Sequence, residues 1–198
     1  MSPYSQQESY QKKLFSAEEA IGRIRSGKRL FIGSACGEPV HLVNALVEQA
    51  KRFSDLEIVR LMSSESSLIS LIANQSKGHN FSIRSIYQGS AVSRELSENK
   101  RYIAPMNLFA VPQLFKKKQL PLHAALVQVS PPDEFGWMSL GVSVDITLAA
   151  AQSADLLIVQ VNPKMPRILG HGFIHVNDVD MIVEHEEEIF AIENVLEF

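Results

Sequence analysis

The chain has 198 residues, of which 45% are hydrophobic and 21% are charged, and its formal net charge is -3. This composition is typical of one soluble globular domain with a substantial core, and no tract is basic enough to indicate a nucleic-acid partner. The polar N-terminus contains no stretch that suits a signal peptide or a membrane span, so we expect no membrane partner and a cytoplasmic location. The single cysteine, Cys36, excludes an internal disulfide and agrees with a reducing compartment.

The first residues differ in character from the rest of the chain. Residues 1–13 are polar, and we expect them to be a flexible segment that is frayed or packs only loosely. Residues 14–198 are expected to form one domain. Ser16 and Glu19 have the spacing of a capping box, which predicts a helix that starts after Ser16 and ends at Gly27. Residues 29–32 follow as the first predicted strand.

A glycine-bearing turn comes directly after this strand. Residues 33–39 contain Gly33, Ser34 and Gly37, and they lead into a helical pattern over residues 42–50. Glycines in a strand-to-helix turn let backbone amides approach an anion or an oxyanion. The turn lacks both the dinucleotide-binding fingerprint and the phosphate-loop Lys-Ser/Thr pair, so a purely structural turn remains the alternative.

The centre of the sequence predicts a β-α-β unit. Residues 124–129 and 155–161 are apolar runs, and residues 143–151 between them are rich in alanine and apolar at helical spacing. Runs without a polar side suit the strands of a parallel sheet that helices cover on both faces. Further strands are predicted over residues 56–62, 81–87, 101–104, 173–176 and 181–184, and further helices over 68–73 and 108–115. We therefore expect an α/β domain with an open, mainly parallel sheet and helices on both faces.

Each central run stops at a polar turn that is rich in proline. The first turn covers residues 130–137 and the second covers residues 162–167. In open α/β sheets the ligand crevice lies outside the carboxyl ends of the strands, so we expect both turns there. Asp133 and Asn162 are the candidate ligand contacts in these turns. For Asp133 the alternative is that its carboxylate only closes the turn through a backbone hydrogen bond.

Three stretches carry a family resemblance. The first is residues 129–133, Val-Ser-Pro-Pro-Asp, which continues through residues 136–145, Gly-Trp-Met-Ser-Leu-Gly-Val-Ser-Val-Asp. The second is residues 161–167, Val-Asn-Pro-Lys-Met-Pro-Arg, with Gly170, residues 173–175 and residues 179–180. The third is the turn over residues 33–39. Together they resemble the N-terminal domain of the acetyl-CoA hydrolase/transferase family of class I CoA-transferases, and the chain is similar to 4-hydroxybutyrate and acetate CoA-transferases within it.

The resemblance implies a fold like that of the CoA-transferase and sugar-phosphate isomerase superfold. It implies an enzyme that moves CoA from an acyl-CoA to a small carboxylic acid, or to water. CoA is then a substrate, and no tightly bound cofactor is expected. The family's nucleophile is a glutamate in the second half of the enzyme, and we expect this chain to lack that half. We therefore expect no catalytic residue here and a C-terminal CoA-transferase domain as partner. An apolar face left uncovered by that domain favours a homodimer.

The turns and the resemblance together give one set of expected substrate-binding residues. They are Gly33, Ser34, Gly37, Asn107, Ser130, Pro131, Asp133, Gly136, Ser139, Gly141, Asn162, Met165, Pro166 and Gly170. Two departures from the family pattern bear on this set. Ile168 stands where a small hydroxyl residue is common, and the turn over residues 33–39 has fewer glycines than many relatives.

Other polar residues have simpler explanations. Glu65, between serines, is the in-chain glutamate with the most nucleophile-like setting, yet a solvated turn residue explains it, and Cys36 reads as a small packed residue. His171 and His175 have helical metal-ligand spacing, but glycines flank His171 and no third ligand is evident, so no metal is expected. Two functions compete with CoA transfer: a non-catalytic binding or regulatory module of the same fold, and a sugar-phosphate isomerase.

Overall fold

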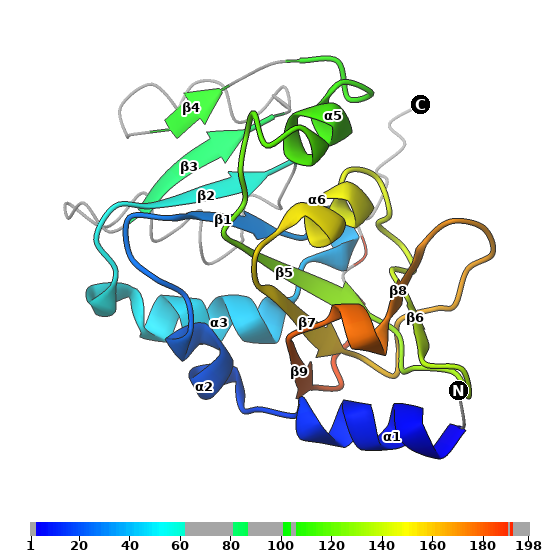
Figure 1. Cartoon of the computed structure of the whole chain (residues 1–198). Helices are drawn as coiled ribbons and strands as arrows, with labels where there is room; N and C mark the ends of the chain where they lie inside the picture. The colour runs from blue at the N-terminus through cyan, green and yellow to red at the C-terminus, as the bar shows by residue number, and fades with distance from the viewer. Residues whose placement is uncertain (1–2, 62–80, 87–100, 104–105, 190, 192–198) are drawn as a thin grey trace, which may run out of the picture.

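The computed structural model describes residues 3–61, 81–86, 101–103, 106–189 and 191, and side chains from residue 6 onward except in residues 101–103. Among these residues, seven strands form one open sheet in the order β4-β3-β2-β1-β5-β7-β9 (Figure 1). Every neighbouring pair in this sheet is parallel. The α/β class and the mainly parallel sheet that the sequence predicts are therefore confirmed.

The strands follow the apolar runs closely. The strands of the sheet are β1 Arg29–Ile32, β2 Leu56–Arg60, β3 Phe81–Ser85, β4 Arg101–Ile103, β5 Ala124–Val129, β7 Leu157–Val161 and β9 Met181–Glu184. All residues of β5 and β7 are buried, because helices cover both faces of the sheet at its centre. Two further strands, β6 Trp137–Ser139 and β8 Phe173–His175, pair antiparallel outside it.

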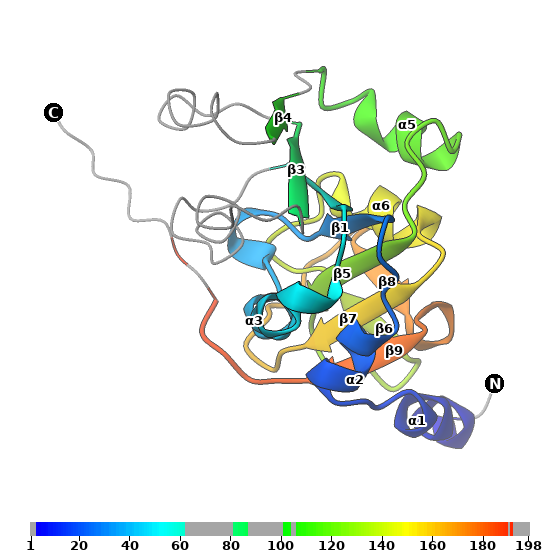
Figure 2. The ribbon, with the colours of Figure 1, turned by 90° about the vertical axis from the view of Figure 1, so that its left-hand side faces the viewer.

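Helices lie on both faces of the sheet, as Figure 2 shows. α2 Ala17–Gly22 and α3 Val40–Glu48 pack on one face, where Ile21, Leu42 and Leu46 share a core with Leu30. α5 Val111–Lys116 and α6 Thr147–Ser153 pack on the other face, around Phe115 and Ala150. Single 3-10 turns occur at η1 Ala35–Gly37, η2 Ala50–Arg52 and η4 Val176–Asp178.

The predicted capping box begins α2, but the helix is shorter than predicted. The Ser16 hydroxyl accepts from the Glu19 amide at 3.2 Å, and Glu19 Oε2 accepts from the Ser16 amide at 2.9 Å. The helix ends at Gly22, well before Gly27. The guanidinium of Arg52 donates to the carbonyls of Gly22 and Ile24 at 2.8 and 2.9 Å, which satisfies the open carbonyls that end the helix.

The N-terminal segment differs from the expectation of a frayed, loosely packed stretch. It contains α1 Pro3–Lys12, and Tyr10 is buried with its hydroxyl donating to Glu184 Oε1 at 2.7 Å. The ammonium of Lys13 donates to the carbonyls of Val176 and Val179 at 2.9 and 2.6 Å. The polar sequence gives no sign of this packing, because every partner lies at the far end of the chain.

Two predictions fall on residues that the structure does not describe. The helix predicted over residues 68–73 and the serine turn that holds Glu65 lie outside the part of the chain that the structure describes. Within the described ranges, no helix is long and apolar enough to cross a membrane. The same ranges contain no cluster of three or more His, Cys, Asp or Glu side chains that could hold a metal ion.

Candidate functional site

The direction in which the chain builds the sheet reverses next to β1. β1 pairs with β2 on one side and with β5 on the other. Ligands of open α/β sheets bind outside the carboxyl ends of the strands at such a switch point. Gly33 directly follows β1 and Ser130 directly follows β5, so the glycine turn and the first Pro-rich turn both start there.

The two Pro-rich turns lie side by side at this carboxyl edge. β5 and β7 are parallel, with Val129 opposite Val161, and the Asn162 amide donates to the Val129 carbonyl at 2.9 Å. Across the turns, Arg167 Nη2 pairs with Asp133 Oδ2 at 2.5 Å. The structure therefore places Asp133 and Asn162 at the same edge of the sheet, as the strand pattern predicts.

The carboxylate of Asp133 is used inside its own turn. Its Oδ1 accepts from the amides of Phe135 and Trp137 at 2.9 and 2.8 Å, while Oδ2 pairs with Arg167. The turn-closing alternative that the sequence left open is thus present in the structure. Contact between Asp133 and a substrate stays a prediction.

Serine hydroxyls join the exits of β5 and β7. Ser130 Oγ accepts from the Ser139 amide at 2.9 Å, and Ser139 Oγ accepts from the amides of Gly141 and Ile168 at 3.1 and 3.2 Å. Gly141 has φ +57°, and a Cβ there would lie 2.2 Å from Met165 Sδ and 2.8 Å from the Pro166 carbonyl oxygen. Five predicted residues, Ser130, Ser139, Gly141, Met165 and Pro166, are therefore brought together in one cluster.

The glycine turn packs against the loop before α6. The Gly33 amide donates to the Leu126 carbonyl at 2.9 Å, and the Gly37 amide donates to the Ser34 carbonyl at 3.0 Å. A Cβ on Gly37 would lie 2.6 Å from the Cβ of Ser143, whose hydroxyl donates to the Ser34 carbonyl at 3.1 Å. Close packing explains the glycine at position 37. The backbone amides of Gly33 and Gly37, predicted to face an anion, already donate to carbonyls within the protein. Anion binding by the turn stays a prediction.

The remaining predicted residues are distributed over different surfaces. Pro131 and Gly136, with Asp133, line a cavity of about 720 Å³ that α1 closes on one side. Gly170 lines a smaller cavity of about 390 Å³ beside Trp137. Asn107 is exposed before α5, where its side chain accepts from the Phe109 amide at 3.0 Å. The structure does not bring Gly170 or Asn107 into the serine cluster.

Sequence reasoning missed a buried polar network on the α3 side of the carboxyl edge. Gln128 and Gln160 lie opposite each other in β5 and β7, each buried among apolar neighbours. Gln128 Nε2 donates to the Glu38 carbonyl at 2.9 Å, and Gln160 Nε2 donates to Glu187 Oε1 at 2.6 Å. The signal was visible in the sequence, since one glutamine interrupts each apolar run just before the strand ends.

Asn162 is the centre of this network. Its side chain is fully buried. The side-chain Nδ2 donates to Gln128 Oε1 at 2.6 Å and to the Glu187 carbonyl at 2.8 Å. Its Oδ1 accepts from the amides of Lys164 and Glu187 at 3.0 and 3.3 Å. The side chain therefore joins three segments: strand β5, its own turn and the segment after β9. Gln128, Gln160, Asn162, Glu38 and Glu187 are named the carboxyl-edge network.

Two ionisable groups in or beside the network have shifted pKa values. Burial raises the pKa of Glu38 from 4.5 to about 7; the charge of Arg60 opposes this rise and that of Glu187 adds to it. The ring of His41 stacks on that of His185 with 3.8 Å between centroids. Burial, followed by the charge of His185, lowers the pKa of His41. Glu38 can thus carry or release a proton near neutral pH at the switch point of the sheet.

The shift at Glu38 predicts a pH dependence of stability. Because its pKa is raised on folding, its stabilising contribution is complete below about pH 4.5 and is lost as the pH rises to about 7. Glu38→Gln removes this titration. We expect the variant to gain about 1–3 kcal/mol over the native chain at pH 8, a range reduced for partial exposure, and little at pH 4.5. Urea unfolding at both pH values measures the difference.

A matched control separates this effect from a general charge effect. Glu134→Gln removes one carboxylate from an exposed position in the first Pro-rich turn. The control is expected to follow the native pH profile. If Glu38→Gln also follows that profile, Glu38 does not hold a proton in the folded chain.

His171 and His175 do not form a helical metal pair. His175 ends strand β8, and its two ring nitrogens contact the Phe135 carbonyl at 2.9 Å and the Asn177 amide at 3.1 Å. Cys36 is a free, partly buried cysteine in η1.

Comparison with known proteins identifies the family. The family model of the acetyl-CoA hydrolase/transferase N-terminal domain matches residues 2–194. The chain is 38% identical over 187 residues to the 4-hydroxybutyrate coenzyme A transferase of Clostridium kluyveri, covering 94% of this chain and 43% of that protein. It is 34% identical over 188 residues to the butyryl-CoA:acetate CoA-transferase of Anaerostipes caccae, covering 93% and 41%.

Solved structures give the same result for the fold. The crystal structure of RipA from Yersinia pestis matches with a TM-score of 0.84 and 27% identity, over 95% of this chain and 46% of that chain. The 4-hydroxybutyrate CoA-transferase of Porphyromonas gingivalis matches with a TM-score of 0.71 and 28% identity, over 94% and 42%. The chain thus spans less than half the length of these relatives. It belongs to the acetyl-CoA hydrolase/transferase family, as that family's N-terminal domain.

Proposed function

We propose that this chain is the amino-terminal half of an enzyme that transfers CoA between an acyl-CoA and a small carboxylic acid, or hydrolyses acetyl-CoA. The observation that carries the proposal is the 38% identity to a 4-hydroxybutyrate coenzyme A transferase along 94% of the chain. The names of the relatives mention 4-hydroxybutyrate, butyryl-CoA and acetate, which favours a short-chain acid. CoA is a substrate here, no tightly bound cofactor is proposed, and we place the enzyme in the cytoplasm.

The reacting group in this proposal is a glutamate outside the chain. Its carboxylate attacks the thioester carbonyl of the acyl-CoA and releases the CoA thiolate, which leaves an acyl-glutamyl anhydride. The thiolate then attacks the glutamyl carbonyl, releases the acid and forms a glutamyl-CoA thioester. A glutamate with a pKa near 4.3 is already ionised at neutral pH, so the attack needs no general base.

This chain would supply one wall of the cleft at the carboxyl edge. The serine cluster and the carboxyl-edge network fix the two Pro-rich turns relative to each other, which supports a preformed wall. A C-terminal domain would carry the opposite wall and the nucleophile.

Complementation tests the proposal directly. The chain alone is expected to show no CoA transfer from butyryl-CoA or acetyl-CoA to acetate or 4-hydroxybutyrate. Adding the remaining region of the Clostridium kluyveri relative, which extends beyond the 43% matched here, is expected to yield transfer. If the chain alone catalyses CoA transfer, and Glu65→Ala abolishes that activity, the proposal is overturned.

A second candidate is a non-catalytic binding or regulatory module of the same fold. The chain matches only 43% of the Clostridium kluyveri relative and 41% of the Anaerostipes caccae relative, so the remaining regions of those proteins are not represented in it. The complementation assay separates the two candidates. A module without a part in catalysis would bind a CoA ester or a carboxylic acid and give no transfer after the remaining region is added.

A further inference from the structure

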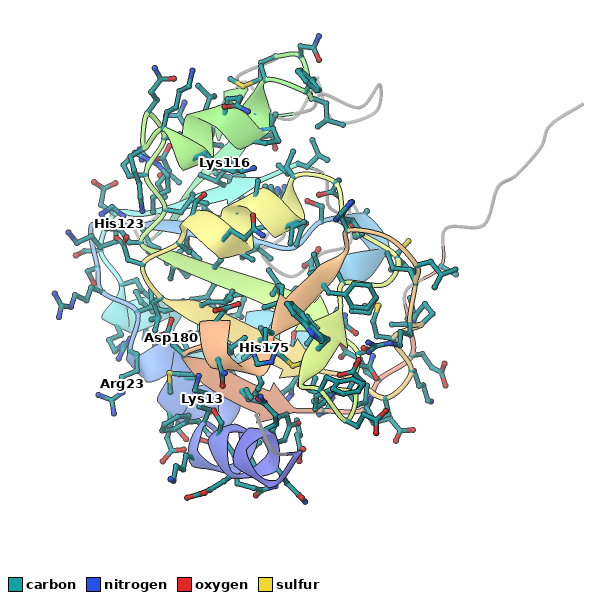
Figure 3. The ribbon with its side chains drawn as sticks, turned by 45° about the vertical axis from the view of Figure 1, so that its right-hand side comes forward. Lys13, Arg23, Lys116, His123, His175 and Asp180 are labelled. Carbon is teal, nitrogen blue, oxygen red and sulfur yellow. The ribbon has the colours of Figure 1, made fainter. Side chains whose placement is uncertain are left out.

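A second large cavity lies at the opposite, amino-terminal edge of the sheet. Its volume is about 640 Å³, and Arg29, Ala124, Leu156 and Met181 line it where β1, β5, β7 and β9 begin. Figure 3 labels His123 just before β5 and Arg23 on the same side of the molecule. This cavity is named the amino-edge pocket. It shares no lining residue with the carboxyl-edge network.

The lining of the amino-edge pocket is positively charged although the chain as a whole has a net charge of -3. Arg23, Arg25, Lys28 and Arg29 line it, against a single carboxylate among its described lining residues, Asp155. That carboxylate is already paired, since Lys118 Nζ lies 3.1 Å from Asp155 Oδ1. An excess of cations in one concave surface attracts and holds an anion.

His123 adds a hydrogen-bond donor of fixed direction. Its Nδ1 accepts from the Arg29 amide at 3.2 Å, so the neutral ring carries its proton on Nε2. Burial, followed by the charge of Lys28, lowers the pKa of His123, which keeps the ring in this neutral, Nε2-protonated form. The ring thus offers a donor beside the cations.

Lys28 offers an ammonium group that is available to a ligand. Among the described residues, its ammonium forms no hydrogen bond or ion pair. The guanidinium of Arg29, by contrast, is held by Glu57 at 2.7 Å and by the Pro121 carbonyl at 3.0 Å. Arg29 therefore contributes charge, while Lys28 and His123 are available to donate hydrogen bonds.

Part of the lining of the amino-edge pocket is apolar. Phe15, Ile24 and Leu156 line it together with the cations. An anion with an apolar body fits this lining better than an inorganic ion does, and the volume of the pocket suits a ligand the size of a nucleotide. A smaller cavity of about 370 Å³ shares Lys28, Arg29 and His123 with the pocket, but the carboxylates of Asp55 and Glu57 also line it, so the phosphate is not placed there.

We propose that the amino-edge pocket binds an organic phosphate. The phosphate faces Lys28 and the Nε2 proton of His123, with Arg25 on the rim, and the aromatic or aliphatic body rests on Phe15, Ile24 and Leu156. Several donors and cations that line one cavity match the charge and the oxygen atoms of a phosphate. The ligand class is therefore a nucleotide or a similar phosphate ester.

Calorimetric titration of the 198-residue chain with ADP tests the proposal. We expect one saturable site for ADP, with adenosine and inorganic phosphate binding much more weakly. Lys28→Gln is expected to weaken ADP binding about tenfold or more, the effect of losing one charge-assisted hydrogen bond. Lys12→Gln removes the same charge from an exposed position on α1 and serves as the matched control.

The outcomes distinguish a built site from general attraction. Absence of saturable ADP binding overturns the proposal, and so does an equal loss of affinity in Lys28→Gln and Lys12→Gln. Competition with CoA, whose nucleotide end is also an adenosine phosphate, identifies the source. If CoA displaces ADP, and Lys28→Gln weakens the binding of CoA as much as that of ADP, the pocket is assigned to CoA. ADP binding that CoA does not displace assigns it to a free nucleotide; both results support the organic phosphate.

Discussion

Gly141→Ala is expected to lower the free energy of unfolding by about 3 kcal/mol. The residue has φ +57°, a left-handed conformation that costs an L-residue about 1–2 kcal/mol. The added Cβ would also lie 2.2 Å from Met165 Sδ and 2.8 Å from the Pro166 carbonyl oxygen. Met165 can move, but the carbonyl belongs to the backbone, so overpacking adds about 1–3 kcal/mol. Urea denaturation of both chains measures the loss.

Gly27→Ala is the matched control for this prediction. Gly27 has φ +65°, close to the value at Gly141, and a Cβ there meets nothing within 4 Å. The free energy of unfolding of the control is therefore expected to fall only by the cost of the left-handed conformation, about 1–2 kcal/mol. Equal losses in the two variants would show that the second Pro-rich turn does not pack against Gly141 as described.

Asn162→Leu is expected to destabilise the chain by about 3 kcal/mol or more. Leucine has a similar size but cannot hydrogen-bond, so Gln128 Oε1 and the Glu187 carbonyl lose their donor inside the protein. The amides of Lys164 and Glu187 lose their acceptor as well. Each buried group left without a partner costs about 1–3 kcal/mol. The loss is again measured by urea denaturation.

Two further variants make this result specific. Asn107→Leu changes an exposed asparagine with one backbone hydrogen bond, and we expect a loss below about 1 kcal/mol. Gln128→Leu in the Asn162→Leu background removes the orphaned amide, so the double variant should lose about 1–2 kcal/mol less than the two single losses combined. Strictly additive losses would mean that Asn162 and Gln128 do not interact.

The sequence predicts the central sheet well because burial alone specifies it. The runs that became β5 and β7 are apolar on both sides, and that pattern has one common explanation, a strand between two helical layers. The capping box at Ser16 is equally local, since both of its partners lie within one helical turn. The common edge of the two Pro-rich turns then follows from the parallel pairing of the strands.

The features that the sequence does not predict depend on contacts between distant segments. The antiparallel pair β6 and β8 consists of two short strands that are separated by α6 and β7. The polar helix α1 is held by Glu184 and, through Lys13 directly after the helix, by a carbonyl at η4. The glutamines at positions 128 and 160 are visible in the sequence, but their partners Glu38 and Glu187 belong to other turns.

The location of the reacting carboxylate tests the account most directly. The chain and the remaining region of the Clostridium kluyveri relative are mixed with acyl-CoA in the absence of an acceptor acid, digested and analysed by mass spectrometry. The account predicts a CoA adduct on a glutamate of the added region and none on this chain. A CoA thioester on Glu38 or Glu65 would contradict it, because the nucleophile would then lie within these 198 residues.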